Sequence, residues 1–251
     1  MIKSGFKIRQ IKQKSLDINQ GFFKKINTTS PYIRAKIAMS KDGKTSFKNK
    51  KNKWITSIAS RNDAQHYRAI SDLIVTGGGT LINDNPSLNV RSKKIIKLKG
   101  FSQPDKAVIT NSQLDFETFK FFQDKSKKLI FTSKKNKVPA SKKLSNTEIK
   151  SVKSEGTKID LKDLRSRLIK LNYKDVLIEA GPGLLTSFIK ANLIDEFIIY
   201  ISPKMLSNTA NYFFNGKSSL NPMLSEKYEK IESTKVGTDK KIILRKKQKW
   251  D

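Results

Sequence analysis

From Pro31 almost to the end of this chain, short apolar runs typical of buried strands alternate with amphipathic segments. The runs DLIVTG (72–77) and DVLIEAG (175–181) are largely apolar and end at glycine, as strands buried on both faces do. Before the second run, LKDLRSRLIKLN (161–172) spaces its leucines three and four residues apart, which is typical of a helix with one apolar face. The sequence therefore predicts an α/β fold with a mainly parallel central sheet flanked by helices.

Further segments fit the same plan. Strands are expected at 32–39, 106–110, 127–132 and 196–206. Helices are expected from an N-cap at Ser57 to about Ile70, and from Gly181 to about Asn192. The run IESTKVGTDKKIILR (231–245) predicts a C-terminal antiparallel hairpin with its turn near Gly237. The polar residues 1–30 are expected to hold one helix, around Leu16 to Ile26.

The net charge of +30 raises the question of nucleic-acid binding, but the kind of basic residue argues against it. Lysine supplies 44 of the 52 basic residues and is scattered along the chain, whereas arginine, the better reader of bases and phosphates, is scarce. We expect no specific nucleic acid as a partner. No apolar stretch approaches the roughly 20 residues that span a membrane, no secretory signal is visible, and cysteine is absent. These features predict a cytoplasmic protein without membrane contact.

Two glycine-rich segments follow predicted strands and open helices, at TGGGT (76–80) and EAGPGLLTS (179–187). Glycine lets the backbone approach a ligand, and the free N–H groups of a helix start attract phosphate. Either segment alone is more typical of an ordinary strand-to-helix turn, because neither has the spacing of a dinucleotide fingerprint. Together they indicate a dinucleotide or a phosphorylated substrate.

Side chains for acid–base chemistry are few. The single histidine, His66, lies among polar residues of a predicted helix and is expected on its surface. Carboxylates at predicted loops or strand ends include Asp42, Asp84 and Glu179, and none has metal-ligand or triad spacing. We expect no metal, and chemistry that belongs to a cofactor, such as hydride transfer.

Four segments of the sequence are similar to those of a known family: PYIRAKIAMSKDGKTS (31–46), KWITS (53–57), GGGTLINDNPSLNVR (77–91) and the long run 176–206. In order and spacing they resemble the reductase half of the bifunctional riboflavin-biosynthesis deaminase–reductase. The resemblance implies a dihydrofolate-reductase-like fold, NADPH as cofactor and a homodimer. The zinc ligands of a deaminase are excluded because the chain has no cysteine. Residues 1–29 are therefore interpreted as a linker or helix remnant and 30–249 as the reductase domain, with a separate deaminase in the same pathway.

The resemblance also implies site residues. Cofactor contacts fall on Ala38, Trp54, Thr80, Asp84, Ser112 and the segment Gly181, Pro182, Gly183, Leu184, Leu185, Thr186 and Ser187. Contacts to a phosphorylated pyrimidine substrate fall on Asn52, Arg68, Leu88, Arg91 and Glu179.

The implied reaction reduces the ribosyl group of 5-amino-6-(5-phosphoribosylamino)uracil to ribityl with NADPH. Arg68 and Arg91 would hold the phosphate, and Asp84 and Lys36 are the candidate catalytic groups that deliver a proton. Trp54 would stack on a ring or lie in the core. The alternatives are a related NADPH reductase of another substrate, a folate reductase, or a basic nucleic-acid-binding protein.

Overall fold

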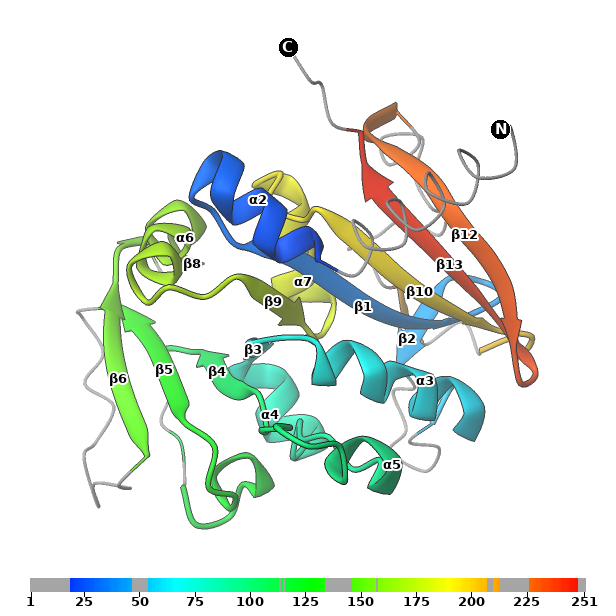
Figure 1. Ribbon diagram of the computed structural model, residues 1–251, viewed down its shortest axis with the longest axis horizontal. Coiled ribbons are helices and arrows are strands. Elements are labelled where there is room, and N and C mark those ends of the chain that lie inside the picture. The colour runs from blue at the N-terminus through cyan, green and yellow to red at the C-terminus, as the bar shows by residue number, and fades with distance from the viewer. Residues whose placement is uncertain are drawn as a thin grey trace, which may run out of the picture.

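The computed structural model describes residues 19–46, 54–112, 114, 116–133, 146–156, 158–206, 210–212 and 226–247. The strands of its main sheet are β1 (Tyr32–Ser40), β3 (Leu73–Gly77), β4 (Asp105–Ile109), β5 (Lys128–Ser133), β6 (Thr147–Val152), β9 (Asp175–Ile178), β10 (Glu196–Ser202), β12 (Tyr228–Val236) and β13 (Asp239–Lys246). They form one nine-stranded sheet in the order β12-β13-β10-β1-β9-β3-β4-β5-β6 (Figure 1). From β10 to β6 all neighbours are parallel, whereas β13 pairs antiparallel with β10 and β12. The predicted sheet and hairpin are confirmed.

Helices cover both faces of this sheet (Figure 1). They are α2 (Gln20–Thr28), α3 (Ile58–Ala69), α4 (Gly78–Asp84), α5 (Lys93–Ile96), the 3-10 turn η1 (Lys120–Phe122), α6 (Leu161–Lys170) and α7 (Pro182–Lys190). Leu164 of α6 and Phe188 of α7 belong to the same buried cluster as Val75 of the sheet. Tyr67 of α3 and Leu81 of α4 belong to a second cluster with Ile74, the neighbour that points the opposite way. The sheet is therefore the middle layer of three.

Local sequence signals position the helices that border the site. Ser57 caps α3 by accepting the Ser60 N–H at 3.3 Å, as its type and place predict. Asp160 caps α6 in the same way. Pro182 is the first residue of α7, where its missing N–H costs nothing.

The structure differs from the expected elements at two strand ends, at one edge strand and in two small sheets. The strand expected to run to 206 ends at Ser202, and β9 ends at Ile178, just before the glycine-rich segment. The edge strand β6 was not predicted, because its sequence TEIKSV lacks a continuous apolar run. Two small sheets were also not predicted, β2 (Lys44–Ser46) with β11 (Asn211–Tyr212) and β7 (Ser154–Glu155) with β8 (Lys158–Ile159). The expected helix around Leu16 to Ile26 is present from Gln20 as α2, and its first part lies outside the described residues.

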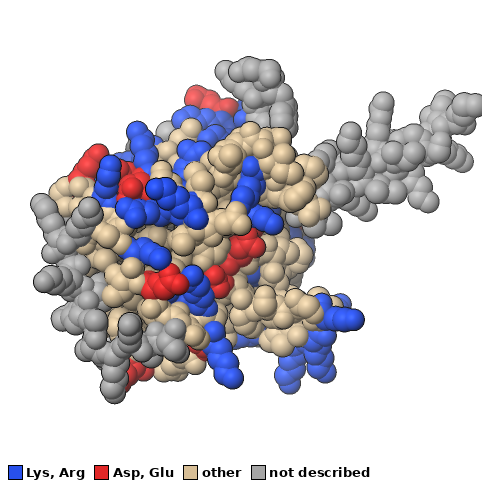
Figure 2. All heavy atoms as spheres, turned by 60° about the vertical axis from the view of Figure 1, so that its left-hand side comes forward, with Lys and Arg blue, Asp and Glu red and all other residues tan. Residues whose placement is uncertain are grey.

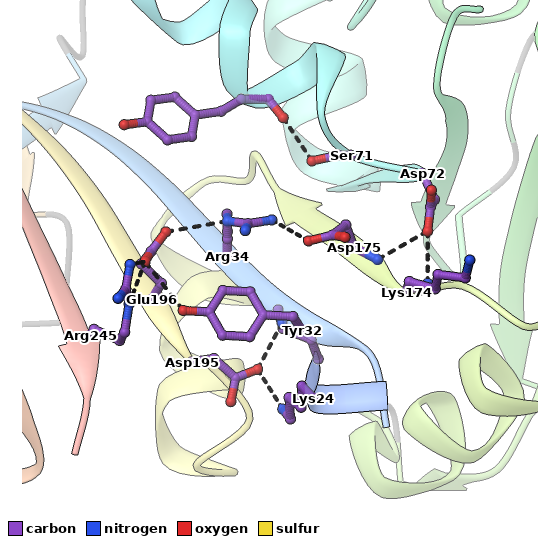
Figure 3. Close-up of polar contacts among 12 residues, drawn as sticks. Lys24, Tyr32, Arg34, Ser71, Asp72, Lys174, Asp175, Asp195, Glu196 and Arg245 are labelled. Carbon is purple, nitrogen blue, oxygen red and sulfur yellow. Dashed lines mark hydrogen bonds and ion pairs between the residues drawn. The ribbon is translucent and has the colours of Figure 1, made fainter. Parts of the chain in front are cut away.

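A buried network of charges joins the first residues of β1, β9 and β10 (Figure 3). The Arg34 guanidinium, 2% exposed, pairs with Asp175 and donates to Glu196 at 3.2 Å. Arg245 of β13 donates to the other oxygen of Glu196 at 2.9 Å. Helix α2 packs closely on this network, since a Cβ added to Gly21 would lie 2.1 Å from an Asp175 oxygen. The network lies at the amino ends of the parallel strands β1, β9 and β10, and Arg245 near the carboxyl end of the antiparallel β13 joins it there.

The lysines are not all on the surface. Figure 2 shows that Lys and Arg on one face are scattered among acidic and uncharged residues and form no continuous basic patch there. Yet Lys106 is buried at the start of β4, where its Nζ donates to the Phe121 carbonyl at 2.7 Å and pairs with Asp124 at 2.8 Å. No helix in the described ranges is long and apolar enough to cross a membrane.

Candidate active site

One large cleft, about 1380 Å³ in volume, opens at the carboxyl ends of β1, β3, β4 and β9, between α4 and α7. Parallel α/β sheets bind ligands at this edge because the loops and helix starts converge there. The cleft brings together most predicted site residues from five separate segments. Those that line it are Lys36, Ala38, Trp54, Arg68, Thr80, Asp84, Leu88, Arg91, Glu179, Gly181, Pro182, Gly183, Leu184, Leu185 and Ser187.

Two of the predicted residues that the structure describes, Thr186 and Ser112, do not line the cleft, and a third predicted residue, Asn52, lies outside the described residues. Thr186 is buried on the inner side of α7, because helical rotation turns it away from its neighbours Leu185 and Ser187. Ser112 is exposed beyond the end of β4, where its N–H donates to the Thr110 hydroxyl at 3.0 Å.

A buried carboxylate that lines the cleft lies between two cations. The Arg68 guanidinium holds Glu179 with two bonds, Nε to Oε1 at 2.6 Å and Nη2 to Oε2 at 3.0 Å. Lys36 Nζ lies 3.5 Å from Oε2. Burial alone would raise the pKa of Glu179, but the positive charges of Arg68 and Lys36 outweigh it and lower the pKa to about 2. Glu179 is therefore an ionised acceptor, and it is no proton donor at neutral pH.

Asp84, the second carboxylate among the predicted site residues, is the last residue of α4, and its side chain is exposed. Lys36 is half-buried on β1, in ion-pair contact with Glu179. Between Asp84 and Arg91 the chain turns through Leu88, whose φ of 50° is in the left-handed region that bulky residues rarely adopt. Backbone strain of this kind concentrates at binding sites. Leu88 is also buried, so the turn is held by packing.

Sequence reasoning missed two cleft residues on α3. Arg61 and Gln65 precede Arg68 by seven and three positions, so the three share one helix face, and all line the cleft. The Gln65 side chain accepts the Arg91 N–H at 2.7 Å and fixes the backbone there. The Arg61 guanidinium lies 4.5 Å from the ring centroid of Trp54, which is 52% exposed in the cleft and is not a core residue. The helical spacing was the signal that could have found both residues. His66, on the same helix, is exposed and does not line the cleft.

The two glycine-rich segments also meet at the cleft, and Glu179 is the first residue of the second segment. The Thr80 hydroxyl accepts the Gly181 N–H at 2.9 Å, which joins the start of α4 to that of α7. Gly78 lies so close to Thr110 that an added Cβ would be 2.3 Å from its hydroxyl oxygen. Gly79 and Gly183 differ, because a Cβ on either would meet no atom within 4 Å and neither has a positive φ. Neither packing nor backbone conformation requires glycine at these two positions of the cleft wall. The missing side chains leave open space beside the starts of α4 and α7. This cradle fits the phosphates of a dinucleotide.

These features are those of a known group of proteins. The profile of the RibD C-terminal domain matches residues 31–242. The chain belongs to this family.

Relatives agree with that assignment. The chain is 38% identical over 252 residues to the riboflavin biosynthesis protein RibD of Buchnera aphidicola subsp. Baizongia pistaciae, covering 95% of this chain and 66% of the relative. It is 30% identical over 210 residues to the 5-amino-6-(5-phosphoribosylamino)uracil reductase of Buchnera aphidicola subsp. Acyrthosiphon pisum, covering 80% of this chain and 99% of the relative. A solved structure of Acinetobacter baumannii RibD (form 1) matches with a TM-score of 0.78 and 32% identity, over 93% of this chain and 63% of that one.

The chain spans 66% of the length of the first RibD relative and 52% of that of the second. The shorter reductase, in contrast, is matched over nearly its whole length. The predicted family and fold class are confirmed by these matches.

Proposed function

We propose that this protein is an NADPH-dependent reductase that converts the ribosyl group of 5-amino-6-(5-phosphoribosylamino)uracil to ribityl in riboflavin biosynthesis. The observation that carries the proposal is the cleft itself, which is lined both by an ionised carboxylate between two cations and by two joined glycine-rich helix starts. Membership of the RibD C-terminal domain family supports the reaction class.

The two glycine-rich segments are proposed to hold the cofactor. Gly79 and Gly183 leave room for its phosphates beside two helix starts, and the Thr80 hydroxyl, which accepts the Gly181 N–H, keeps the two segments together. Ala38, Trp54 and Lys36 line the same cleft. Bound NADPH supplies a hydride, which C1′ of the substrate accepts.

The charged groups around Glu179 are proposed to hold the substrate. The Glu179 carboxylate accepts hydrogen bonds from pyrimidine N–H groups, and its low pKa keeps it an acceptor. The C1′–O4′ bond of the ribose breaks, and O4′ must take a proton. We assign this proton to Lys36, the ammonium beside Glu179, with Asp84 at the cleft rim as the relay to solvent. Leu88 and Arg91 contact the substrate from the strained turn.

The wider context is also a proposal. Residues 30–249 form the reductase domain and residues 1–29 the linker, and a separate deaminase acts in the same pathway. We propose a cytoplasmic homodimer, which sedimentation at several protein concentrations would test.

The deciding assay is consumption of NADPH with the deaminated pyrimidine phosphate, compared with the same compound before deamination. Turnover with the deaminated substrate alone is expected. No NADPH oxidation with either compound would remove the proposal. A fluorescence titration should give much tighter binding of NADPH than of NADH, and equal affinities would remove the choice of NADPH.

A further inference from the structure

The Leu88 turn, residues 85–91 after α4, is held by side chains that lie outside the cleft. Leu88 itself lines the cleft, and its φ of 50° is a conformation that a bulky residue keeps only when its surroundings hold it. Two side chains that do not line the cleft, Gln103 and Lys106, bind the backbone of the turn on either side of Leu88. The reaction proposed above uses neither of them.

Lys106 joins three segments through one buried ammonium. Its Nζ donates to the Ser87 carbonyl at 3.0 Å and to the Phe121 carbonyl at 2.7 Å, and it pairs with Asp124 at 2.8 Å. The Ser87 carbonyl belongs to the peptide group that precedes Leu88. The bond to Lys106 therefore fixes one side of the rotation that gives Leu88 its positive φ.

Gln103 holds the other side of the turn. Its side-chain oxygen accepts the Val90 N–H at 2.8 Å, and its side-chain nitrogen donates to the Val90 carbonyl at 2.8 Å. Val90 cannot rotate without breaking both bonds. Gln103 and Lys106 are three positions apart, at the entry to β4 and in its first residues. One short segment at the start of β4 thus sets the shape of the turn.

The next strand carries a lysine in the same environment that does not reach the turn. Lys128 of β5 is the register partner of Lys106, and the two side chains are 2% and 1% exposed. Both pair with Asp124, Lys106 through Oδ2 at 2.8 Å and Lys128 through Oδ1 at 3.1 Å. Lys128 also donates to the Asp124 carbonyl. Burial and the ion pair are therefore common to both lysines, whereas the bond to Ser87 distinguishes Lys106.

We propose that Lys106 and Gln103 are positioning residues for substrate binding, which keep the Leu88 turn in its binding shape before the substrate arrives. The proposal rests on the proposed function for the assignment of this turn to the substrate. A turn that is already shaped loses little conformational entropy when it binds. If the hold is lost, only the molecules with a correctly shaped turn can bind, and the apparent affinity falls by that fraction.

Hydrogen exchange of the Arg91 amide, in the protein without ligands, tests the hold on the turn without any activity. This N–H is bound to the Gln65 side chain at the end of the turn. Lys106→Met should speed its exchange about 10-fold, the usual worth of a charge-assisted hydrogen bond. Lys128→Met is the matched control, because it removes an equally buried lysine from the same carboxylate. It should change the exchange rate of Arg91 by less than about twofold.

Gln103→Met is the second variant, because it removes both bonds to Val90 and leaves no charge unpaired. It should speed exchange of the Arg91 amide by at least about threefold. This variant keeps the proposal testable should Lys106→Met fail to fold.

Turnover tests what the hold does for binding. Lys106→Met should raise KM for the deaminated pyrimidine phosphate about 10-fold, and Gln103→Met by at least about threefold. Both should change kcat and the NADPH affinity by less than about twofold, because neither side chain lines the cleft. Lys106→Arg, which keeps a cation with several donors, should recover part of the KM. Lys128→Met should keep the KM of the parent.

Exchange at Arg91 that is unchanged in folded Lys106→Met, or equally fast in Lys128→Met, would overturn the hold assigned to Lys106. Unchanged exchange in Gln103→Met would do the same for Gln103. A parent-like KM in a variant whose Arg91 amide exchanges fast would overturn the role in substrate binding. Failure of the proposed function differs from all of these, because the parent would then oxidise no NADPH while the exchange rates still separated Lys106 from Lys128.

Discussion

Replacing Arg68 by methionine should cost the protein about 3 kcal/mol of stability near neutral pH. The change leaves the Glu179 carboxylate, 8% exposed, with Lys36 at 3.5 Å as its one remaining charged partner among the described residues. At about 1.4 kcal/mol for each tenfold change in proton affinity, lowering the pKa of Glu179 from 4.5 to about 2 is worth roughly 3 kcal/mol. That figure agrees with the cost of breaking a buried ion pair, about 3–5 kcal/mol. For a chain of this size, the melting temperature should fall by about 6–12 °C.

The assay is urea unfolding of four proteins: the parent, Arg68→Met, Glu179→Gln and the double variant. Each single change leaves one buried charge unmatched, so the double variant should be more stable than the sum of the two losses predicts. The stabilisation from Glu179 is fully present above pH 4.5, the unfolded pKa, and is lost as pH falls toward 2, so the gap between parent and Arg68→Met should close over that range. A loss under about 1 kcal/mol, or simple additivity in the double variant, would refute the reasoning.

Three further substitutions and one binding titration test other parts of the molecule. Asp84→Asn should lose about 10²–10⁴ in turnover with unchanged melting temperature and NADPH affinity, since Asn preserves any capping role and only the ionisable group is lost; near-normal turnover would leave Asp84 as a turn residue. Gly183→Ala should melt no lower than the parent, because its Cβ meets no atom within 4 Å, yet bind NADPH at least several-fold more weakly; unchanged affinity would remove the cradle. Gly21→Ala, the same exchange in another helix, should lose about 1–3 kcal/mol because its Cβ would collide with Asp175, and an unchanged urea midpoint would contradict that packing. Random duplex DNA should bind only at low salt in a gel-shift titration, and selective binding at physiological salt would contradict the view that the lysine excess is compositional.

Much of the fold could be predicted from short stretches of the sequence. The runs at 72–77 and 175–181 became β3 and β9 because an unbroken apolar strand has no stable place except the middle of a sheet. Ser57 and Pro182 marked helix starts that the structure keeps, since capping depends on neighbours a few residues away. The edge strand β6 escaped prediction because its place depends on β5, with which it pairs, and its own pattern is weak.

The contacts within the site could not be predicted from short stretches of the sequence. The sequence located the two glycine-rich segments at the ends of predicted strands, because an apolar run that ends at glycine is a local pattern, but it predicted no strand order. Only the tertiary structure decided what the site residues do to one another. Arg68 and Glu179 are 111 positions apart, and their pairing follows from the packing of α3 against the end of β9. That contact joins the Arg68 guanidinium to a buried carboxylate, an arrangement that no sequence spacing contains because it depends on which charges share a buried space.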